Sequence, residues 1–356
     1  MKIAKLRKKI DIIDGHILNL LEERARLSLS IGRTKSKKGA NVYAPDREEE
    51  VYKKVIHRNK GPLSERSIKA VYREIMSASR SVQTALNIAY FGPRATFTHI
   101  AALKKFGASV DYVECAGIGE VFTEVERGRA DYGVVPIENS TEGAVNYTLD
   151  IFVDSELKIC SEVYLPIEHH LISRAKKLSS IKTVYSHEQV FAQCRLWLEA
   201  NLPRATLTPV SSTTAAAVYA LSGKKSAAIT SKLAAEIYGG RLKILARSIQ
   251  DSPHNITRFL VIGKHEVNPT RRDKTSVMFT MKDRAGALHD ILAPFKKNRI
   301  NLTKIESRPS KKKAWKYYFF VDMEGHRDEK NVKKALAALK KKCLLLKVLG
   351  SYPKST

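Results

Sequence analysis

The sequence predicts a multidomain protein built from three consecutive parts of different fold class. An all-α part spans residues 1–86, an α/β part spans residues 87–265, and an α+β part spans residues 274–354. Three patterns predict this division: helical periodicity at the start, short β-branched runs alternating with helical stretches in the middle, and a strand–helix–strand–strand–helix–strand order at the end. A chain of 356 residues is long enough to build several hydrophobic cores.

The first helix is predicted by apolar residues at alternating three- and four-residue spacing, which are Ile3, Leu6, Ile10, Ile13, Ile17, Leu20, Leu27 and Ile31. This apolar seam is typical of a long amphipathic helix, here to about residue 35, that packs against other helices. Arg24 occupies a seam position where Leu or Ile is expected. Because a buried charge without a partner costs about 3–5 kcal/mol, Arg24 either extends along its apolar stem to solvent or meets an anion.

Two more cations bear on Arg24. Lys35 follows it by three helical turns and therefore lies on nearly the same face. Arg7 precedes it by seventeen residues, a separation of about 25 Å at the rise of an α-helix, so one small ligand cannot contact both arginines. If Arg7 also binds a ligand, it must serve the site of another copy. The pattern therefore predicts an intertwined oligomer.

Two further helices complete the all-α part. The first helix is expected to break at residues 38–41, a second helix to open after Pro45, and a third to begin near Ser64, with a Gly-Pro pair at 61–62 between the last two. On the third helix, polar side chains again replace apolar ones along one stripe, which holds Tyr72, Met76, Ser79 and Gln83. The second and third helices thus also carry candidate site residues.

The middle of the chain reads as a largely parallel sheet with helices between its strands. Strands are predicted at residues 87–91, 110–113, 132–137 and 259–262. The loops at residues 92–97 and 138–143 follow two of these strands, and the polar segment 254–258 precedes the last one. Since ligands bind beyond the carboxyl ends of parallel strands, these loops are candidate site segments.

The last part has the order of a ferredoxin-like fold. After a polar linker at residues 266–273, strands are predicted at 276–281, 301–306, 315–321 and 344–349, and helices at 286–297 and 329–341.

Composition limits the classes of partner and compartment. The formal charge is +27, distributed as +10 over residues 1–86, +3 over residues 87–265 and +14 over residues 266–356. The basic runs lack interleaved aromatic residues, so nucleic-acid binding is not expected. The absence of a long apolar run or a signal peptide predicts a cytoplasmic protein without membrane contact. The four cysteines form no CxxC pair, so neither a metal nor a disulfide framework is expected, and no cofactor is expected.

Several motifs, taken in order, identify a family resemblance. They are the cations and Glu48 at helical spacing in the first part, Pro136-Ile137-Glu138-Asn139-Ser140, Ser186-His187-Glu188-Gln189 with Gln193-Cys194, Asn255-Ile256-Thr257-Arg258-Phe259, Gly286-Ala287-Leu288, and Glu306-Ser307-Arg308-Pro309. In this order the chain resembles the bifunctional P-protein family, chorismate mutase fused to prephenate dehydratase and a regulatory ACT domain. The resemblance covers essentially all 356 residues. It implies an intertwined helical dimer for the first part and a two-lobed dehydratase similar to periplasmic binding proteins for the second.

For the mutase, the resemblance implies one site lined by Arg24, Lys35, Arg47, Glu48, Ser79 and Gln83, with Arg7 entering from the partner subunit. Chorismate carries two carboxylates and rearranges by a pericyclic step, so the site needs cations that hold one conformer and stabilise charge on the ether oxygen. The resemblance assigns the arginines to the carboxylates, Lys35 and Gln83 to the ether oxygen, and Glu48 to the hydroxyl. One departure from the family is Ala44, where relatives carry an acidic residue.

For the dehydratase, the resemblance implies Thr257 at the leaving hydroxyl of prephenate. Arg258 is expected to be a structural or substrate cation, and Glu138, Asn139, Ser140 and Gln193 to surround the ligand. Glu138 is a second candidate for the acid, since a threonine alone is a poor proton donor. His187 either touches substrate or caps a helix. The Arg94-Ala95 pair departs from the family, which has a glycine before Thr96.

For the ACT part, the resemblance implies an amino-acid effector site, with phenylalanine as the expected effector. Its residues are Gly286, Ala287, Leu288, Glu306, Ser307 and Arg308. Two other classes of function remain open from the residues alone: an amino-acid-responsive nucleic-acid-binding regulator, drawn from the ACT motifs and the charge, and a solute-binding module without catalysis. Neither explains Arg24 and Lys35 in an apolar seam.

Overall fold

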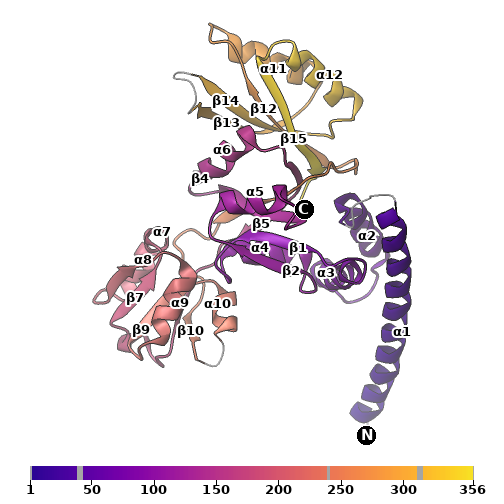
Figure 1. Cartoon of the computed structure of the whole chain (residues 1–356). Helices are drawn as coiled ribbons and strands as arrows, with labels where there is room; N and C mark the ends of the chain where they lie inside the picture. Colours follow the sequence, from indigo (N-terminus) through magenta and orange to yellow (C-terminus); the bar gives the residue numbers. More distant parts are fainter. Residues whose placement is uncertain (1, 38–42, 239–240, 311–315, 356) are drawn as a thin grey trace.

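The computed structural model describes residues 2–37, 43–238, 241–310 and 316–355. The predicted succession of a helical part, a two-lobed α/β part and a ferredoxin-like part is confirmed. Figure 1 shows the ferredoxin-like part above the two-lobed part, with the helical part at one side. Residues 38–41, where the first helix was predicted to break, lie outside the described residues. Trp315, at the start of a predicted strand, also lies outside them.

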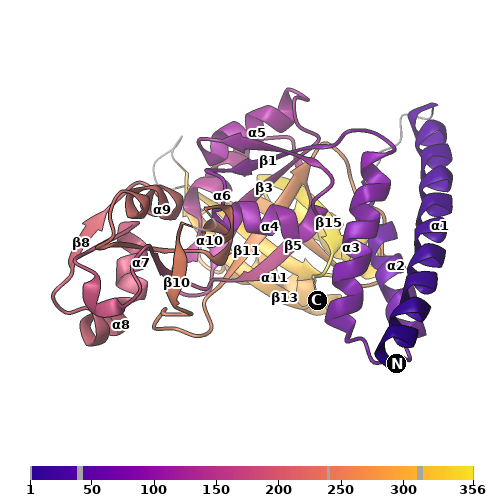
Figure 2. The same ribbon diagram turned by 90° about the horizontal axis from the view of Figure 1, so that it is seen from below.

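The helical part consists of α1 (Lys2–Lys37), α2 (Pro45–Arg58) and α3 (Glu65–Ser81). The third helix begins near Ser64 as predicted, and Ser64 caps it, because its hydroxyl accepts a hydrogen bond from the Ser67 amide at 3.1 Å. Both views show α1 at the outer edge of the molecule (Figures 1 and 2). The eight apolar seam residues of α1 are between 48% and 68% exposed in the single chain. The packing that the seam predicts therefore has no counterpart within one copy.

The first lobe of the α/β part contains a six-stranded sheet of order β2-β1-β3-β11-β5, with β4 paired to β3. Its strands are β1 (Asn87–Phe91), β2 (Asp111–Cys115), β3 (Tyr132–Asn139), β4 (Gly143–Ala144), β5 (Lys158–Pro166) and β11 (Ile256–Gly263). Its helices are α4 (Phe97–Phe106), α5 (Ile118–Glu126) and α6 (Asn146–Asp154). Buried apolar side chains on both faces of the sheet form its core.

The second lobe contains a five-stranded sheet of order β10-β6-β9-β7-β8. Its strands are β6 (His170–Ser173), β7 (Thr183–Ser186), β8 (Thr206–Pro209), β9 (Ser226–Thr230) and β10 (Lys243–Ala246). Its helices are α7 (Glu188–Gln193), α8 (Arg195–Asn201), α9 (Thr213–Leu221), α10 (Lys232–Ile237) and the 3₁₀ turn η1 (Leu178–Ser180). In Figure 2 this lobe lies at the opposite end of the molecule from α1.

The prediction of a largely parallel sheet is wrong in one strand that matters for the site. Strands β1, β2 and β3 run parallel, but β11 runs antiparallel to both of its neighbours, β3 and β5. The chain leaves the first lobe after β5 and comes back from the second lobe along β11, so β11 must point the other way. This reversal places the start of β11 beside the end of β3.

The ferredoxin-like part is an antiparallel sheet of order β13-β14-β12-β15 with two helices. Its elements are β12 (Asp273–Thr280), α11 (Ala287–Lys297), β13 (Leu302–Pro309), β14 (Tyr317–Glu324), α12 (Lys330–Lys340) and β15 (Leu345–Pro353). One sheet face packs on the helices, and the other shares a core with the first lobe. Gly350 permits this contact, since a Cβ there would lie 2.3 Å from the Ile159 carbonyl oxygen.

Candidate functional site

The first polar cluster joins the seam arginine of α1 to the end of α3. The guanidinium of Arg24 donates hydrogen bonds to the Ser79 hydroxyl and, at 3.4 Å, to the Ile75 carbonyl. Two residues past the end of α3, the Gln83 Nε2 donates to the Ser79 carbonyl at 3.1 Å. The Gln83 Oε1 is buried and has no hydrogen-bond partner among the described residues. Hydrogen bonds therefore link Arg24, Ser79 and Gln83 in one cluster, as predicted. The Gln83 Oε1 is a hydrogen-bond acceptor of this cluster that the described residues do not use.

The electrostatic state of this cluster favours an anion. Partial burial lowers the pKa of Arg24, and the neighbouring positive charge of Arg47 lowers it further, against an opposing contribution from Tyr72. Burial also lowers the pKa of Lys35. A lowered pKa means that the surroundings disfavour the cationic form, so a carboxylate that approached either side chain would stabilise its charged form.

The structure separates Arg47 from its neighbour Glu48. Arg47 is exposed and pairs with Glu50 at 2.6 Å. Glu48 is buried and pairs with Arg80 of α3 and, at 3.3 Å, with Lys105 of α4. The expectation that Glu48 lines the Arg24 site is therefore not met in this chain, because two cations hold its carboxylate at the contact with the first lobe. Lys105 is 57 positions away in sequence, so the helical spacing gave no sign of it.

Arg7 is not brought to the Arg24 cluster. It lies in the exposed first half of α1. The separation that the helix rise predicts between Arg7 and Arg24 is thus preserved within one copy.

The second polar cluster forms where the end of β3 meets the start of β11. The strand register pairs Thr257 with Asn139. The Asn139 amide donates at 2.7 Å to the Thr257 hydroxyl and at 2.7 Å to the Asn255 side-chain oxygen. Ser140 closes the loop, because its hydroxyl donates to the His254 carbonyl and accepts from the Ile256 amide, both at 2.9 Å. Thr257 and Asn255 are both buried.

Gln193 reaches this cluster from the second lobe. Its Oε1 accepts a hydrogen bond from the Asn255 amide at 3.4 Å, and its Nε2 donates to the Glu142 carboxylate at 3.0 Å. Four predicted residues, Asn139, Ser140, Gln193 and Thr257, are thus collected at the junction of the two lobes. Polar side chains from two lobes converge there, as expected of a ligand site between domains.

Sequence reasoning missed His169, which contacts Gln193 through Nε2 at 2.9 Å. It stands in the short connection between β5 and β6. The polar run Glu168-His169-His170 between two strands was a signal that could have been followed. His187, by contrast, caps α7: its ring nitrogen accepts from the Gln189 amide at 3.3 Å, which agrees with the capping alternative.

Arg258 and Glu138 lie on the opposite face of the sheet from Thr257 and Asn139. Side chains alternate along a strand, and both residues fall inside β11 and β3, one position from the cluster. The prediction that Glu138 surrounds the same ligand as Asn139 is therefore wrong in this structure. Arg258 was expected to be either a structural cation or a substrate cation. Its contacts agree with the structural role.

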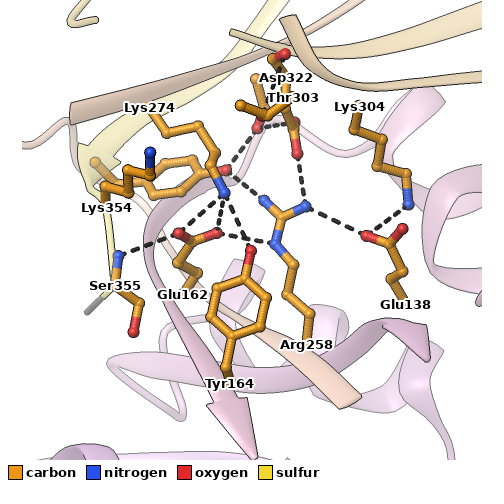
Figure 3. A network of polar contacts seen from close by, with 12 residues as sticks. Glu138, Glu162, Tyr164, Arg258, Lys274, Thr303, Lys304, Asp322, Lys354 and Ser355 are labelled. Carbon is orange, nitrogen blue, oxygen red and sulfur yellow. Dashed lines mark hydrogen bonds and ion pairs between the residues drawn. The ribbon is translucent and has the colours of Figure 1, made fainter. Parts of the chain in front are cut away.

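Arg258 belongs to a buried ion network between the first lobe and the ferredoxin-like part, which Figure 3 shows. Its guanidinium contacts Glu162 at 2.9 Å, Asp322 at 2.6 Å and the Tyr352 hydroxyl at 2.9 Å. Two lysines complete the network: Lys274 lies 2.8 Å from Glu162, and Lys304 lies 3.0 Å from Glu138. Glu138 also lies 3.6 Å from Arg258. Three cations thus face three carboxylates, a balanced set that tolerates burial.

We expect Arg258→Met to lower the free energy of unfolding by about 3–5 kcal/mol, because it leaves Glu162 and Asp322 without their shared partner. Urea unfolding followed by circular dichroism measures this change. The matched control is Arg26→Met, which removes an exposed i,i+4 pair with Glu22 and should leave the urea midpoint nearly unchanged. Equal, small effects of the two substitutions would show that the network is not a stabilising element.

The expected effector residues lie on α11 and β13. Gly286 precedes α11 with a φ of 77°, a left-handed conformation that favours glycine. Ala287 is buried, whereas Leu288 is 38% exposed. Glu306, Ser307 and Arg308 stand on β13. The Arg308 guanidinium contacts the Asp150 carboxylate of α6 at 3.2 Å, beside a cavity of about 460 Å³ between α6 and β13.

The two departures from the family pattern have visible structural consequences. Ala44 is the N-cap residue of α2 and has no side chain to accept a capping hydrogen bond. Ala95 adopts a φ of 72°, the conformation for which a glycine is suited. The carbonyls of Arg94 and Ala95 accept hydrogen bonds at 2.8 Å from Thr214 and Ser231, so this loop joins the two lobes.

Among the described residues, no helix is long and apolar enough to cross a membrane. The same part of the chain holds no group of three or more His, Cys, Asp or Glu side chains that could bind a metal ion.

Comparison with known proteins gives one consistent answer for each part. Residues 6–84 match chorismate mutase type II, residues 88–267 match prephenate dehydratase, and residues 275–341 match the ACT domain. A bifunctional chorismate mutase/prephenate dehydratase of Aquifex aeolicus is 51% identical, covering 99% of this chain and 98% of the relative. The Escherichia coli K12 protein of the same name is 32% identical, covering 99% and 96%.

A solved prephenate dehydratase from Arthrobacter aurescens, in complex with L-Phe, has a TM-score of 0.70 at 37% identity, covering 76% of this chain and 90% of that one. The prephenate dehydratase of Staphylococcus aureus has a TM-score of 0.66 at 28% identity, covering 75% and 100%. With full-length relatives and a family match for each of its three parts, this chain belongs to the family of bifunctional chorismate mutase/prephenate dehydratases.

Proposed function

We propose that this chain catalyses two successive steps of phenylalanine biosynthesis, with residues 1–86 converting chorismate to prephenate and residues 87–265 converting prephenate to phenylpyruvate. Residues 274–354 regulate the second step. The observation that carries the proposal is that one chain holds two separate polar clusters. The Arg24 cluster has the residue types that a dianion rearrangement needs, and the Thr257 cluster has those that an assisted dehydration needs.

The mutase step requires positioning and charge stabilisation rather than an acid or a base. Arg24 and Arg47 supply donors for the two carboxylates of chorismate. Lys35 and Gln83 stabilise the ether oxygen; Gln83 does so through Nε2, which is its only donor group. Ser79 holds the Arg24 guanidinium in place. Glu48 would have to leave Arg80 and Lys105 before it could bind the substrate hydroxyl.

The dehydratase step removes carbon dioxide and water from prephenate, and aromatisation of the ring drives it forward. The Thr257 hydroxyl already receives a hydrogen bond from Asn139, so its own proton is free to point at a leaving hydroxyl. Gln193, on the second lobe, brings an amide to the opposite side of the junction. Closure of the two lobes would exclude water from the reacting groups.

We further propose that the active form is a dimer or a tetramer in which Arg7 of one copy completes the mutase site of its partner. The exposed apolar seam of α1 supports this, because a face of that size on a helix is normally covered by another chain. We propose the cytoplasm as the compartment. All four cysteines are free thiols, which suits a reducing compartment.

Phenylalanine is the proposed effector, because the chain carries an ACT match and a 37% identical relative was solved in complex with L-Phe. Its site would involve Gly286, Ala287 and Leu288 together with Glu306, Ser307 and Arg308. Binding would act by favouring a less active state through a difference in affinity between two states.

The test is to supply the purified protein with chorismate and follow prephenate and phenylpyruvate over time, with and without phenylalanine. We expect both products to form in sequence, and the second to form more slowly when phenylalanine is present. Prephenate that accumulates without phenylpyruvate would refute the dehydratase assignment. A rate of phenylpyruvate formation that phenylalanine leaves unchanged would refute the effector assignment alone.

A further inference from the structure

Two buried histidines stand side by side where the chain first passes between the lobes. His169 and His170 are 1% and 3% exposed. The His169 backbone is fixed to the returning segment of the chain, since its carbonyl accepts from the Ile249 amide at 2.9 Å and its amide donates to the Gln250 side chain at 3.0 Å. His169 therefore belongs to the junction between the lobes rather than to either sheet.

The ring of His169 touches the second-lobe member of the Thr257 cluster. Its Nε2 lies 2.9 Å from the Gln193 Oε1, and its ring packs edge-on against Phe97 of the first lobe, with centroids 5.4 Å apart. The other end of the Gln193 amide faces the Glu142 carboxylate at 3.0 Å. A carboxylate accepts and an amide nitrogen donates, so the amide oxygen of Gln193 is the atom that faces His169.

This arrangement fixes the tautomer of the imidazole. An amide oxygen only accepts, so His169 must carry its proton on Nε2 and leave a lone pair on Nδ1. Burial lowers the pKa of His169 to about 4, with a smaller opposing contribution from the Gln193 hydrogen bond and a further lowering by His170. The ring is therefore a neutral donor at physiological pH.

A purely structural explanation does not account for a histidine at this position. The His169 Nδ1 is buried and has no hydrogen-bond partner among the described residues, and burying an unpaired polar atom opposes folding. An apolar side chain of similar size would avoid that cost. The gain from a histidine is its single well-placed donor to Gln193.

We propose that His169 is a positioning residue for the dehydratase reaction, whose Nε2–H holds the Gln193 amide against the cluster of Asn139, Asn255 and Thr257. The inference rests on the proposed function of that cluster. It assigns to His169 no contact with substrate and no transfer of a proton. Its effect reaches the reaction through the orientation of Gln193.

Two polar substitutions of the full-length protein separate this role from a general need for a polar side chain. In His169→Gln the side-chain amide nitrogen extends about as far from the backbone as Nε2 and can still donate to Gln193. We therefore expect dehydratase kcat within about threefold of the unmodified chain. In His169→Asn the amide ends at the position of Nδ1 and cannot reach Gln193. For that variant we expect kcat to fall about tenfold or more, the equivalent of one lost hydrogen bond, with a smaller change in KM.

Two controls complete the experiment. His170→Asn alters the neighbouring buried histidine, which accepts from the Ser248 amide, and should spare dehydratase kcat. The double variant of His169→Asn with Gln193→Leu should lose no more activity than Gln193→Leu alone, because both changes remove one interaction. Circular dichroism of the same preparations reports that each variant is folded.

Equal dehydratase kcat in the Gln and Asn variants of His169, or losses that multiply in the double variant, would overturn the positioning role. Failure of the unmodified chain to convert supplied prephenate would instead refute the proposed function itself. The two failures are therefore distinguishable.

Discussion

Replacing Arg24 with alanine is expected to lower turnover of chorismate by about 100- to 1000-fold, the range found when a group that stabilises transition-state charge is removed. Arg24 is the seam cation of α1 whose guanidinium donates hydrogen bonds to Ser79 and Ile75 of α3. Its loss removes the guanidinium that is proposed to bind a carboxylate of chorismate, and it also removes a hydrogen bond to the Ser79 hydroxyl. Turnover of supplied prephenate should remain near that of the unmodified chain, because the Thr257 cluster lies in a different part of the fold.

The measurement is to assay both reactions on one preparation of Arg24→Ala. The matched control is Arg26→Ala, two positions along the same helix, whose exposed side chain pairs with Glu22. We expect that control to retain both activities. If Arg24→Ala remains folded yet loses both reactions together, the two sites are not separate and the division of labour proposed for the chain is wrong.

Replacing Thr257 with alanine is expected to have the reverse effect. Dehydratase turnover should fall by about 100- to 1000-fold, within the range for a lost general acid, while chorismate is still converted to prephenate. The hydroxyl is the only group removed, and the Asn139 amide loses the acceptor that lies 2.7 Å away. Prephenate should therefore accumulate when this variant is given chorismate.

A threonine on an exposed edge strand provides the control for this substitution. Thr206 stands on β8 of the second lobe, away from the cluster, and Thr206→Ala should retain both reactions. Thr257→Ser, which keeps the hydroxyl, should restore much of the lost turnover. Full dehydratase activity in Thr257→Ala would show that the Thr257 hydroxyl takes no part in the reaction. Asn139 and Gln193 would then be the members of the cluster that act on the substrate.

The helices were predictable because their signals are local. The apolar spacing of α1, the proline at the start of α2 and the start of α3 near Ser64 are signals that act within a few residues, and the structure places the three helices as the sequence indicates. Arg24 was predicted to differ from the apolar residues of the seam. The structure agrees, since the Arg24 guanidinium donates a hydrogen bond to Ser79 of α3.

The errors concern side chains whose surroundings depend on distant segments. Glu138 was expected around the same ligand as Asn139, and a substrate role was open for Arg258, but β3 and β11 extend far enough that alternation turns both side chains away from Thr257. Their partners Asp322 and Lys304 come from the ferredoxin-like part, which no local pattern connects to β11. Glu48 is a similar case, because its carboxylate pairs with Lys105 of α4, a residue distant in sequence, instead of facing α1.

The reversed strand β11 has a similar origin. Whether a strand runs parallel or antiparallel depends on where the chain re-enters the sheet, and here it re-enters after forming a complete second lobe. The same reversal brings residues 139 and 257 into register, so the property that was predicted wrongly is the one that builds the dehydratase cluster.

The central claim is that α1 serves two mutase sites, with Arg24 in one and Arg7 in the other. Mixing Arg7→Ala with Arg24→Ala, two variants expected to be inactive as mutases, tests it most directly. After subunit exchange, each mixed dimer contains one site with both arginines intact, so chorismate turnover should recover to about one quarter of that of the unmodified chain, by the symmetry of a two-fold dimer. No recovery, in mixtures shown by differently tagged copies to have exchanged subunits, would contradict the claim.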